Sequence, residues 1–130
     1  MNSPSAPTLS SLLQIAMPVK DIARAVAFYR DVLGVRFLFQ AGNLAFFDLD
    51  GVRLLLDVVE DPEFDHPGSV LYFRVPDIDA AYAGLHARGV EFTGPPHVIH
   101  RDDRQELWMA FFRDGEQNVH ALAAEVPLAR

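Results

Sequence analysis

The sequence predicts an α+β fold built from two copies of one unit. In the first copy, Val19-Lys20-Asp21-Ile22 is followed by an alanine-rich apolar segment and by Gly34-Val35-Arg36-Phe37. In the second copy, Val75-Pro76-Asp77-Ile78 precedes a similar segment and Gly89-Val90-Glu91-Phe92. The shared order of strand, capped helix, glycine and Val-x-Phe indicates a duplication. Two such copies usually lie around a pseudo-twofold axis, so we expect a ligand in the groove between them.

Length and composition favour a single domain. The chain has 130 residues, and 50% of them are hydrophobic, which suits one buried core. We expect a flexible tail at 1–11 and the domain at 12–130, with one module at about 12–60 and the other at about 69–124. There is no apolar run of about 18 residues and no signal peptide, which predicts a cytoplasmic protein without a membrane partner.

Two counts exclude further classes of function. The chain has no cysteine, which excludes disulfides, thiolate zinc sites and cysteine nucleophiles. Its formal net charge of −7 disfavours nucleic acid as a partner, because nucleic-acid binding depends on basic side chains that neutralise phosphates.

The first unit begins with a strand and a helix. Apolar residues alternate with other types over 12–19, and this period of two predicts a strand. Asp21 can cap a helix whose apolar residues recur every three or four positions, and Gly34 can end it in the left-handed conformation. Further strands are expected at 35–40, 44–48 and 52–58, with turns at 41–43 and 50–51 and a linker at 60–69.

The second unit repeats this order. A strand is expected at 70–75, Asp77 can cap the next helix, and Gly89 can close it. Strands are then expected at 90–93, 98–100, 106–112 and 119–123, with the last turn at 114–118.

The opening and closing segments resemble one family. Residues 15–22, followed by Phe28-Tyr29-Arg30-Asp31-Val32-Leu33-Gly34, are similar to the opening signature of the vicinal oxygen chelate superfamily, which includes glyoxalase I, bleomycin-resistance proteins and extradiol dioxygenases. The closing segment 112–118 resembles that family's Phe-x-Asp-Pro-Asp-Gly-Asn turn, with Gly115 in place of proline and Gln117 in place of glycine. The resemblance implies two tandem βαβββ modules whose curved sheets form a cup, often completed or shared in a homodimer.

The resemblance also implies four positions for a divalent metal. They fall on Gln14, Val70, the neighbourhood of Leu55 with Asp57 two residues along, and Ala121. Only Gln14 matches a ligand type, because valine and alanine offer no lone pair. We therefore expect no usual metal site and no other cofactor. The alternative is a metal held by Gln14 with Asp57 or a repositioned histidine.

Strand alternation predicts which side chains line the cup. The expected lining is Gln14, Ala16, Arg53, Leu55, Asp57, Val70, Tyr72, Arg74, Val119, Ala121 and Ala123. Arg53 and Arg74 could pair a carboxylate or phosphate on a small organic ligand. In the alternative interpretation they sit at strand ends and bond Asp57 or solvent.

A second polar cluster lies at 95–108. His97 and His100 are three residues apart, so on an extended strand they face opposite sides and can share a metal only if the segment bends. Either could touch a ligand at the mouth of the cup, and His100 with Glu106 across the hairpin is a candidate acid–base pair. In the alternative, the cluster is a salt-bridged hairpin tip with ordinary polar strand residues.

The remaining aromatic and histidine residues are more typical of structural positions. Trp108 is a candidate ligand contact, although its alternation with apolar residues is commoner in a core. His120 is expected to be buried on the helix side with its hydrogen bonds satisfied, whereas His86 and His66 should be solvated.

Two classes of function are compatible with these observations. The first is a metal-free binding protein that holds a small organic ligand, anionic if the arginines bind it, in the cup of a homodimer. The second is a metal-dependent lyase, isomerase or dioxygenase of the glyoxalase I kind. The missing metal ligands favour the first class, and the fold alone does not choose between them.

Overall fold

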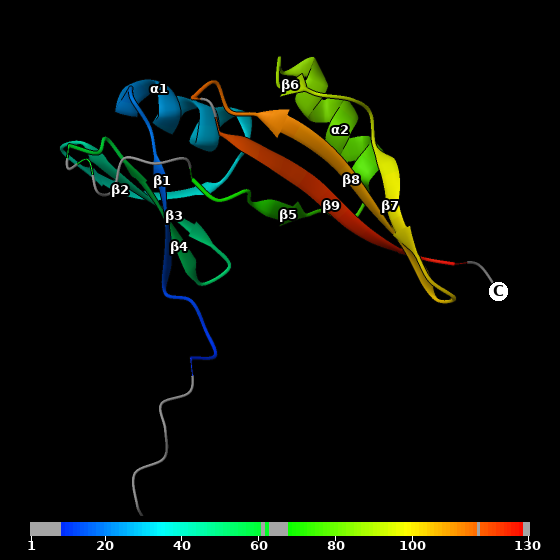
Figure 1. Cartoon of the computed structure of the whole chain (residues 1–130). Helices are drawn as coiled ribbons and strands as arrows, with labels where there is room; N and C mark the ends of the chain where they lie inside the picture. The colour runs from blue at the N-terminus through cyan, green and yellow to red at the C-terminus, as the bar shows by residue number, and fades with distance from the viewer. Residues whose placement is uncertain (1–8, 61, 63–67, 117, 129–130) are drawn as a thin grey trace, which may run out of the picture.

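The fold consists of two mixed β-sheets, and a helix lies on one face of each sheet (Figure 1). The computed structural model describes residues 9–60, 62, 68–116 and 118–128. Most of the expected tail and of the expected linker, including His66, therefore lies outside the described residues. None of the described helices is both long and apolar enough to cross a membrane.

The first sheet has the strand order β1-β4-β3-β2, and β1 runs parallel to β4. Its elements are β1 (Gln14–Pro18), α1 (Ile22–Ala27), the π-helical segment η1 (Phe28–Val32), β2 (Arg36–Ala41), β3 (Leu44–Leu49) and β4 (Val52–Asp57). As expected, Asp21 caps α1 by accepting a hydrogen bond from the Arg24 backbone N–H, 3.1 Å away.

The second sheet repeats this arrangement with β5, β9 and β8 in the places of β1, β4 and β3. Its elements are β5 (Tyr72–Arg74), α2 (Ile78–Ala87), β6 (Glu91–Phe92), β7 (His97–Arg101), β8 (Gln105–Arg113) and β9 (Val119–Pro127). Asp77 caps α2 through the Ala80 backbone N–H at 3.1 Å. The duplication read from the sequence is thus a duplication of sheet topology and of capping.

The two modules differ at the edge furthest from β1 and β5. In the first module β2 fills this edge alone, whereas in the second module β6 and β7 share it, because both pair with β8. Pro95 and Pro96 lie between β6 and β7, and proline cannot donate a ladder hydrogen bond. The strands expected at 90–93 and 98–100 are therefore two parts of one edge.

The helix expected to run unbroken to Gly34 changes its hydrogen bonding on the way. The Leu33 backbone N–H donates to the Phe28 carbonyl at 2.9 Å, the i to i+5 spacing of a π-helix. Gly34 then takes a φ of +75° and Gly89 takes +91° at the same place in the second unit, the left-handed conformation that glycine adopts at little cost.

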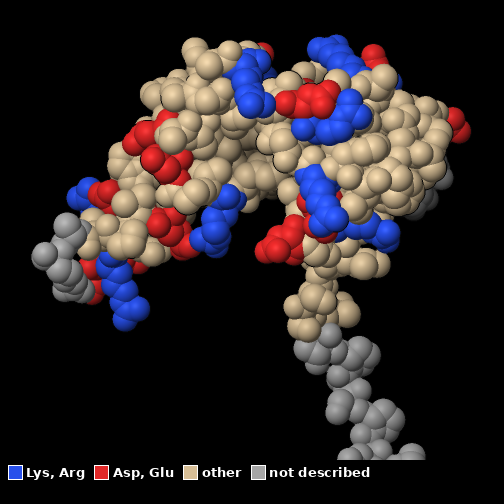
Figure 2. Space-filling view, turned by 180° about the vertical axis from the view of Figure 1, so that it is seen from behind, with Lys and Arg blue, Asp and Glu red and all other residues tan. Residues whose placement is uncertain are grey.

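Two apolar clusters form the core, one under each helix. Met17, Tyr29, Phe47, Leu54 and Leu56 are fully buried in the first cluster. Phe112, Ala110 and Leu122 centre the second cluster, and Phe28, Leu33 and Phe73 pack against both. Because α1 and α2 both lie on the upper side in Figure 1, the opposite faces of the sheets are left uncovered, and Figure 2 shows a hollow between the two lobes with basic side chains on either side.

Candidate functional site

The uncovered face of the first sheet is lined by three cross-strand rows. The middle row runs from Ala16 through Leu55 to Phe46, which in turn pairs with Phe39. A bulge in β2 between Phe37 and Phe39 brings Phe39 onto this face. Arg53, the expected cup residue on β4, lies in the next row, between Gln14 and Asp48.

Arg53 has an unusual setting on this face. Its guanidinium carbon lies 5.6 Å from the centroid of the Phe46 ring, within the range of a cation–π contact. Phe46 also stacks on Phe39, with ring centroids 4.5 Å apart. The Nε of Arg53 is buried and has no hydrogen-bond partner among the described residues. An unpaired buried N–H destabilises the fold, so a hydrogen-bond acceptor that reached this atom would be stabilising.

The sequence identified Arg53 but not its aromatic neighbours. Phenylalanine on a strand is usually buried, so residue type alone does not mark Phe39 and Phe46 as ligand contacts. In the structure, Phe39 is 47% exposed. The alternation that placed Leu55 in the cup places Phe46 there as well, once their cross-strand pairing is known.

The other expected arginine is already partnered. Arg74 donates to Glu125 at 2.7 Å across β5 and β9, and its side chain is 78% exposed. Tyr72, 55% exposed, lies beside it on the uncovered face and meets Phe111 edge-on. The second sheet thus offers an aromatic surface, but its arginine is neutralised by a carboxylate.

The two histidines of β7 lie on the same side of the strand. His97 pairs with Met109 and His100 pairs with Leu107, and these partners share one face of β8. The expectation of opposite faces assumed a regular strand. A bulge between Val98 and His100 adds one residue to β7, and this extra residue places His100 on the same side as His97.

Glu106, by contrast, is separated from His100. It lies on the other face of β8, where it accepts a hydrogen bond from the indole N–H of Trp108 at 3.1 Å and forms a salt bridge with Arg101. The hydrogen bond from Trp108 is the main cause that lowers the pKa of Glu106, and the hydrogen bond from Arg101 is the next. The structure does not bring His100 and Glu106 together as an acid–base pair.

Trp108 is part of the helix-covered face. It packs against the second core cluster and is paired with Ala124 and Val98 across the sheet. This arrangement places it on the opposite side of β8 from His97, away from the uncovered face that carries Tyr72.

The four positions implied for a metal do not supply a ligand set. Gln14 is exposed on β1, Val70 is 41% exposed, and Ala121 is fully buried. The Leu55 side chain has no atom that could bind a metal, and Asp57 lies two residues further along β4 on the same face. Within the described ranges, no group of three or more histidine, aspartate or glutamate side chains is placed to hold a metal. This donor chemistry does not fit the family's metal.

A second group of polar side chains is buried at the closing turn. Asp114 accepts hydrogen bonds from the Tyr29 hydroxyl at 2.7 Å, from the Asn118 side-chain amide at 2.8 Å and from the backbone N–H groups of Glu116 and Asn118 at 2.7 and 3.1 Å. The Asn118 amide also donates to the Pro18 carbonyl at 3.2 Å. The turn that resembles the family signature therefore connects the second module to the first.

His120 belongs to the same network. Its Nδ1 accepts a hydrogen bond from the Leu71 backbone N–H at 3.2 Å, so the ring proton is on Nε2, which donates to the Tyr29 oxygen at 2.8 Å. Burial lowers the pKa of His120, and the charge of Asp114 opposes this effect. Burial, and then Asp114, raise the pKa of Tyr29. His120 is buried and satisfied on the helix side, as the alternation of β9 predicts.

The comparisons with known proteins agree with this geometry. The sequence profile of the Glyoxalase/Bleomycin resistance protein/Dioxygenase superfamily matches residues 11–119. The uncharacterized protein YraH of Bacillus subtilis (strain 168) is 32% identical over 83% of this chain and 93% of its own. Metallothiol transferase FosB of Lysinibacillus sphaericus (strain C3-41) is 33% identical over 42% of this chain and 38% of its own. The crystal structure of lactoylglutathione lyase from Agrobacterium tumefaciens superposes with a TM-score of 0.69 at 22% identity, covering 90% of this chain and 95% of the other. The chain belongs to the Glyoxalase/Bleomycin resistance protein/Dioxygenase superfamily.

Proposed function

We propose that this protein binds a small planar organic anion in its cup, without the metal that the family's enzymes use. The observation that carries the proposal is the unpaired, buried Nε of Arg53, whose guanidinium lies against Phe46. A small rotation of the side chain would turn this N–H and a second guanidinium N–H toward a ligand carboxylate, which could accept from both in the bidentate geometry that arginine favours.

The aromatic pair beside Arg53 suggests the rest of the ligand. Phe39 is half-exposed and stacks on Phe46, so a flat apolar ring could cover the open part of Phe39. Leu55 and Ala16 continue the apolar surface along the row. One charged anchor next to an aromatic and aliphatic floor is a common composition for a small-molecule site.

A homodimer would complete the cup. Of the described strands, β1 and β5 each have a ladder partner on one side only, β4 and β9 respectively. Val70 and Tyr72, beside the open edge of β5, are exposed apolar side chains. We propose that these edges meet in a second copy, because exposed edges with apolar neighbours favour pairing with another chain.

The metal-free part of the proposal rests on donor chemistry. Gln14 alone cannot hold a divalent ion strongly, and Val70 and Ala121 contribute no ligand atom. We expect purified protein dialysed against nickel, zinc, iron and manganese in turn to retain far less than one equivalent, measured by elemental analysis. Retention of about one equivalent of any of them would overturn this part and favour a metal-dependent lyase, isomerase or dioxygenase.

The anion site is tested with 2-naphthoate and its neutral partner 2-naphthamide. We expect 2-naphthoate to shift the backbone amide resonances of β3 and β4, and 2-naphthamide to bind about tenfold more weakly. Arg53→Met, which keeps the apolar stem but removes the charge, should abolish the preference for the anion.

Arg74→Met is the matched control, since Arg74 is already paired with Glu125. It should leave the affinity for 2-naphthoate within about twofold of the original. Equal affinities for acid and amide in the unmodified protein, or an unchanged preference in Arg53→Met, would contradict the proposed function.

A further inference from the structure

We infer that the protein has a second ligand site, for a neutral apolar molecule, in a cavity between the two modules on the helix side of the sheets. The cavity has a volume of about 500 Å³ and opens beside a second hollow of about 820 Å³ with which it shares residues 33–35, Phe73 and Arg74. Volumes of this size are typical of small-molecule sites. The site lies on the opposite side of the sheets from the proposed anion site.

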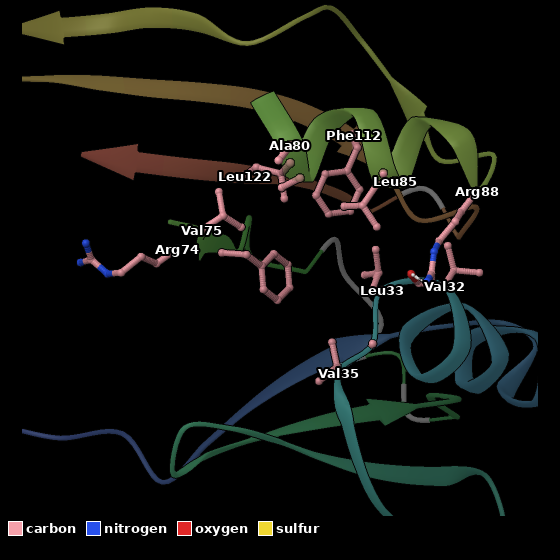
Figure 3. A pocket seen from close by; sticks show the side chains of 14 residues that line it. Val32, Leu33, Val35, Arg74, Val75, Ala80, Leu85, Arg88, Phe112 and Leu122 are labelled. Carbon is pink, nitrogen blue, oxygen red and sulfur yellow. Dashed lines mark hydrogen bonds between the residues drawn. The ribbon is translucent and has the colours of Figure 1, made fainter. Parts of the chain in front are cut away.

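Both modules contribute walls to the cavity. Leu33 and Val35, at the end of the first helical segment, form one wall, and Phe73, Leu85 and Leu122 belong to the other (Figure 3). In Figure 3, Leu33 points from one wall and Leu85 from the other toward the space between them. The lining is therefore mostly apolar, and a ligand there would touch both modules at once.

Small residues on α2 keep this space open. Ala80, Ala81 and Gly84 line the cavity from one face of the helix. A Cβ built on Gly84 would have no heavy atom within 4 Å, so the space beside it is free of protein atoms. Glycine inside a helix is unfavourable relative to alanine, and nothing in the local packing of Gly84 requires its small size.

The charged groups at the two ends of the cavity are already engaged. Arg88 donates to the carbonyl oxygens of Asp31 and Val32, at 3.1 and 3.4 Å, and so caps the end of the first helical segment. Arg74 is paired with Glu125 and points away from the cavity (Figure 3). Arg74 is thus paired with a carboxylate, and Arg88 is held at the rim by two carbonyl groups. The walls between them are apolar, so the site should select a neutral ligand, because burying an ion against these walls would be costly.

The test uses N-phenyl-1-naphthylamine, a neutral probe whose fluorescence rises in apolar surroundings. We expect saturable binding to the unmodified protein, and a rise in its thermal midpoint at saturating probe, because a ligand that binds only the folded state stabilises it. Gly84→Leu should fill the cavity and weaken probe binding about tenfold or more, with a thermal midpoint no lower than that of the unmodified protein.

Two controls and a second filling variant make the result specific. Ala83→Leu adds the same side chain at a position of α2 that does not line the cavity, and it should leave probe binding unchanged. Ala80→Leu, a second filling variant, should weaken binding as Gly84→Leu does. Arg53→Met should leave it unchanged, because Arg53 lies outside the cavity, so failure of the proposed anion site would not affect this result.

Several outcomes would overturn the inference. They are absence of saturable binding, binding that survives both filling variants, and binding that Arg53→Met weakens as strongly as Gly84→Leu. Probe binding that disappears as the protein is concentrated into an oligomer would assign the cavity to a second copy of the chain and would also overturn it.

Discussion

The closing turn and the uncovered face of the first sheet differ in how completely their polar side chains are hydrogen-bonded. At the turn, Asp114 accepts four hydrogen bonds, and His120 and Tyr29 complete a buried chain. On the uncovered face, the Nε of Arg53 has no partner among the described residues and Phe39 remains half-exposed. The comparison teaches that the polar groups that hold the two modules together are fully satisfied, whereas the Nε of Arg53, which we propose for a ligand, is left unsatisfied at some cost.

The features that this chain shares with its family lie in the turn between the modules more than at the positions implied for a metal. The family-like turn still ties the modules together through Asn118 and Asp114. Of the positions implied for a metal, those of Val70 and Ala121 carry no donor atom. Polar residues in a family signature therefore do not by themselves indicate activity, since here they serve the packing of two modules.

Removing the Asp114 carboxylate should lower the free energy of unfolding more than any other change at the closing turn or on the uncovered face. Asp114→Ala would leave buried donors on Tyr29, Asn118 and the turn backbone without an acceptor, and each unsatisfied donor costs about 1–3 kcal/mol. We expect the free energy of unfolding to fall by at least about 3 kcal/mol, measured by urea denaturation followed by circular dichroism. Asp103→Ala, at an exposed position of the β7–β8 turn, should change it by less than about 0.5 kcal/mol. A loss as small in Asp114→Ala would contradict the structural role of the turn.

A milder change tests the contact between the modules alone. Tyr29→Phe keeps the ring that packs near Phe47 but removes the hydroxyl between Asp114 and His120. We expect a loss of about 1–3 kcal/mol in the free energy of unfolding, because the Nε2–H of His120 is left without an acceptor. Tyr82→Phe offers a comparison on α2, where the ring is only partly buried. Equal effects of the two substitutions would argue against the network.

The network should also make stability depend on pH. Burial lowers the pKa of His120, so the folded protein resists a proton that the unfolded chain accepts below about 6.5. The contribution of this histidine is therefore present above that pH and decreases as the pH falls below it. Urea denaturation between about pH 7.5 and pH 5.5 should show this decrease. His120→Gln, which cannot titrate, should show a smaller one, and an identical pH dependence in both proteins would rule out His120 as the cause.

The smallest expected effect is on the uncovered face. Arg53→Met removes the unpaired N–H while keeping a side chain that can cover Phe46. We expect the free energy of unfolding to change by no more than about 1 kcal/mol, and in the direction of greater stability, even though anion binding is lost. A loss of about 3 kcal/mol or more would show that Arg53 is part of the structure instead.

Local patterns in the sequence predicted most of the fold. Asp21 and Asp77 cap their helices, Gly34 and Gly89 end the two helical segments, and Asp50 with Gly51 makes the tight turn, with φ values of 51° and 94°. Each of these features depends on a few neighbouring residues, and so it can be read along the chain.

The side chains on the uncovered faces were harder to predict, because strand irregularities decide which way they point. The bulge in β7 turns His97 and His100 to one side, and the bulge in β2 brings Phe39 beside Phe46. One extra residue reverses the alternation on which the prediction of a face depends. Nothing in the local sequence announced either bulge.

The sequence alone determined the order of elements, the duplication and the apolar residue types at Val70 and Ala121, because these follow from residue types and short-range backbone preferences. Only the tertiary structure showed that Glu106 serves Arg101 and Trp108, that Arg74 is paired, and that Asp114 and His120 join the modules through Tyr29. Tyr29 and Asp114 are 85 residues apart in the chain, and a hydrogen bond over that separation depends on how two sheets pack. That packing is a property of the whole core, so no local pattern contains it.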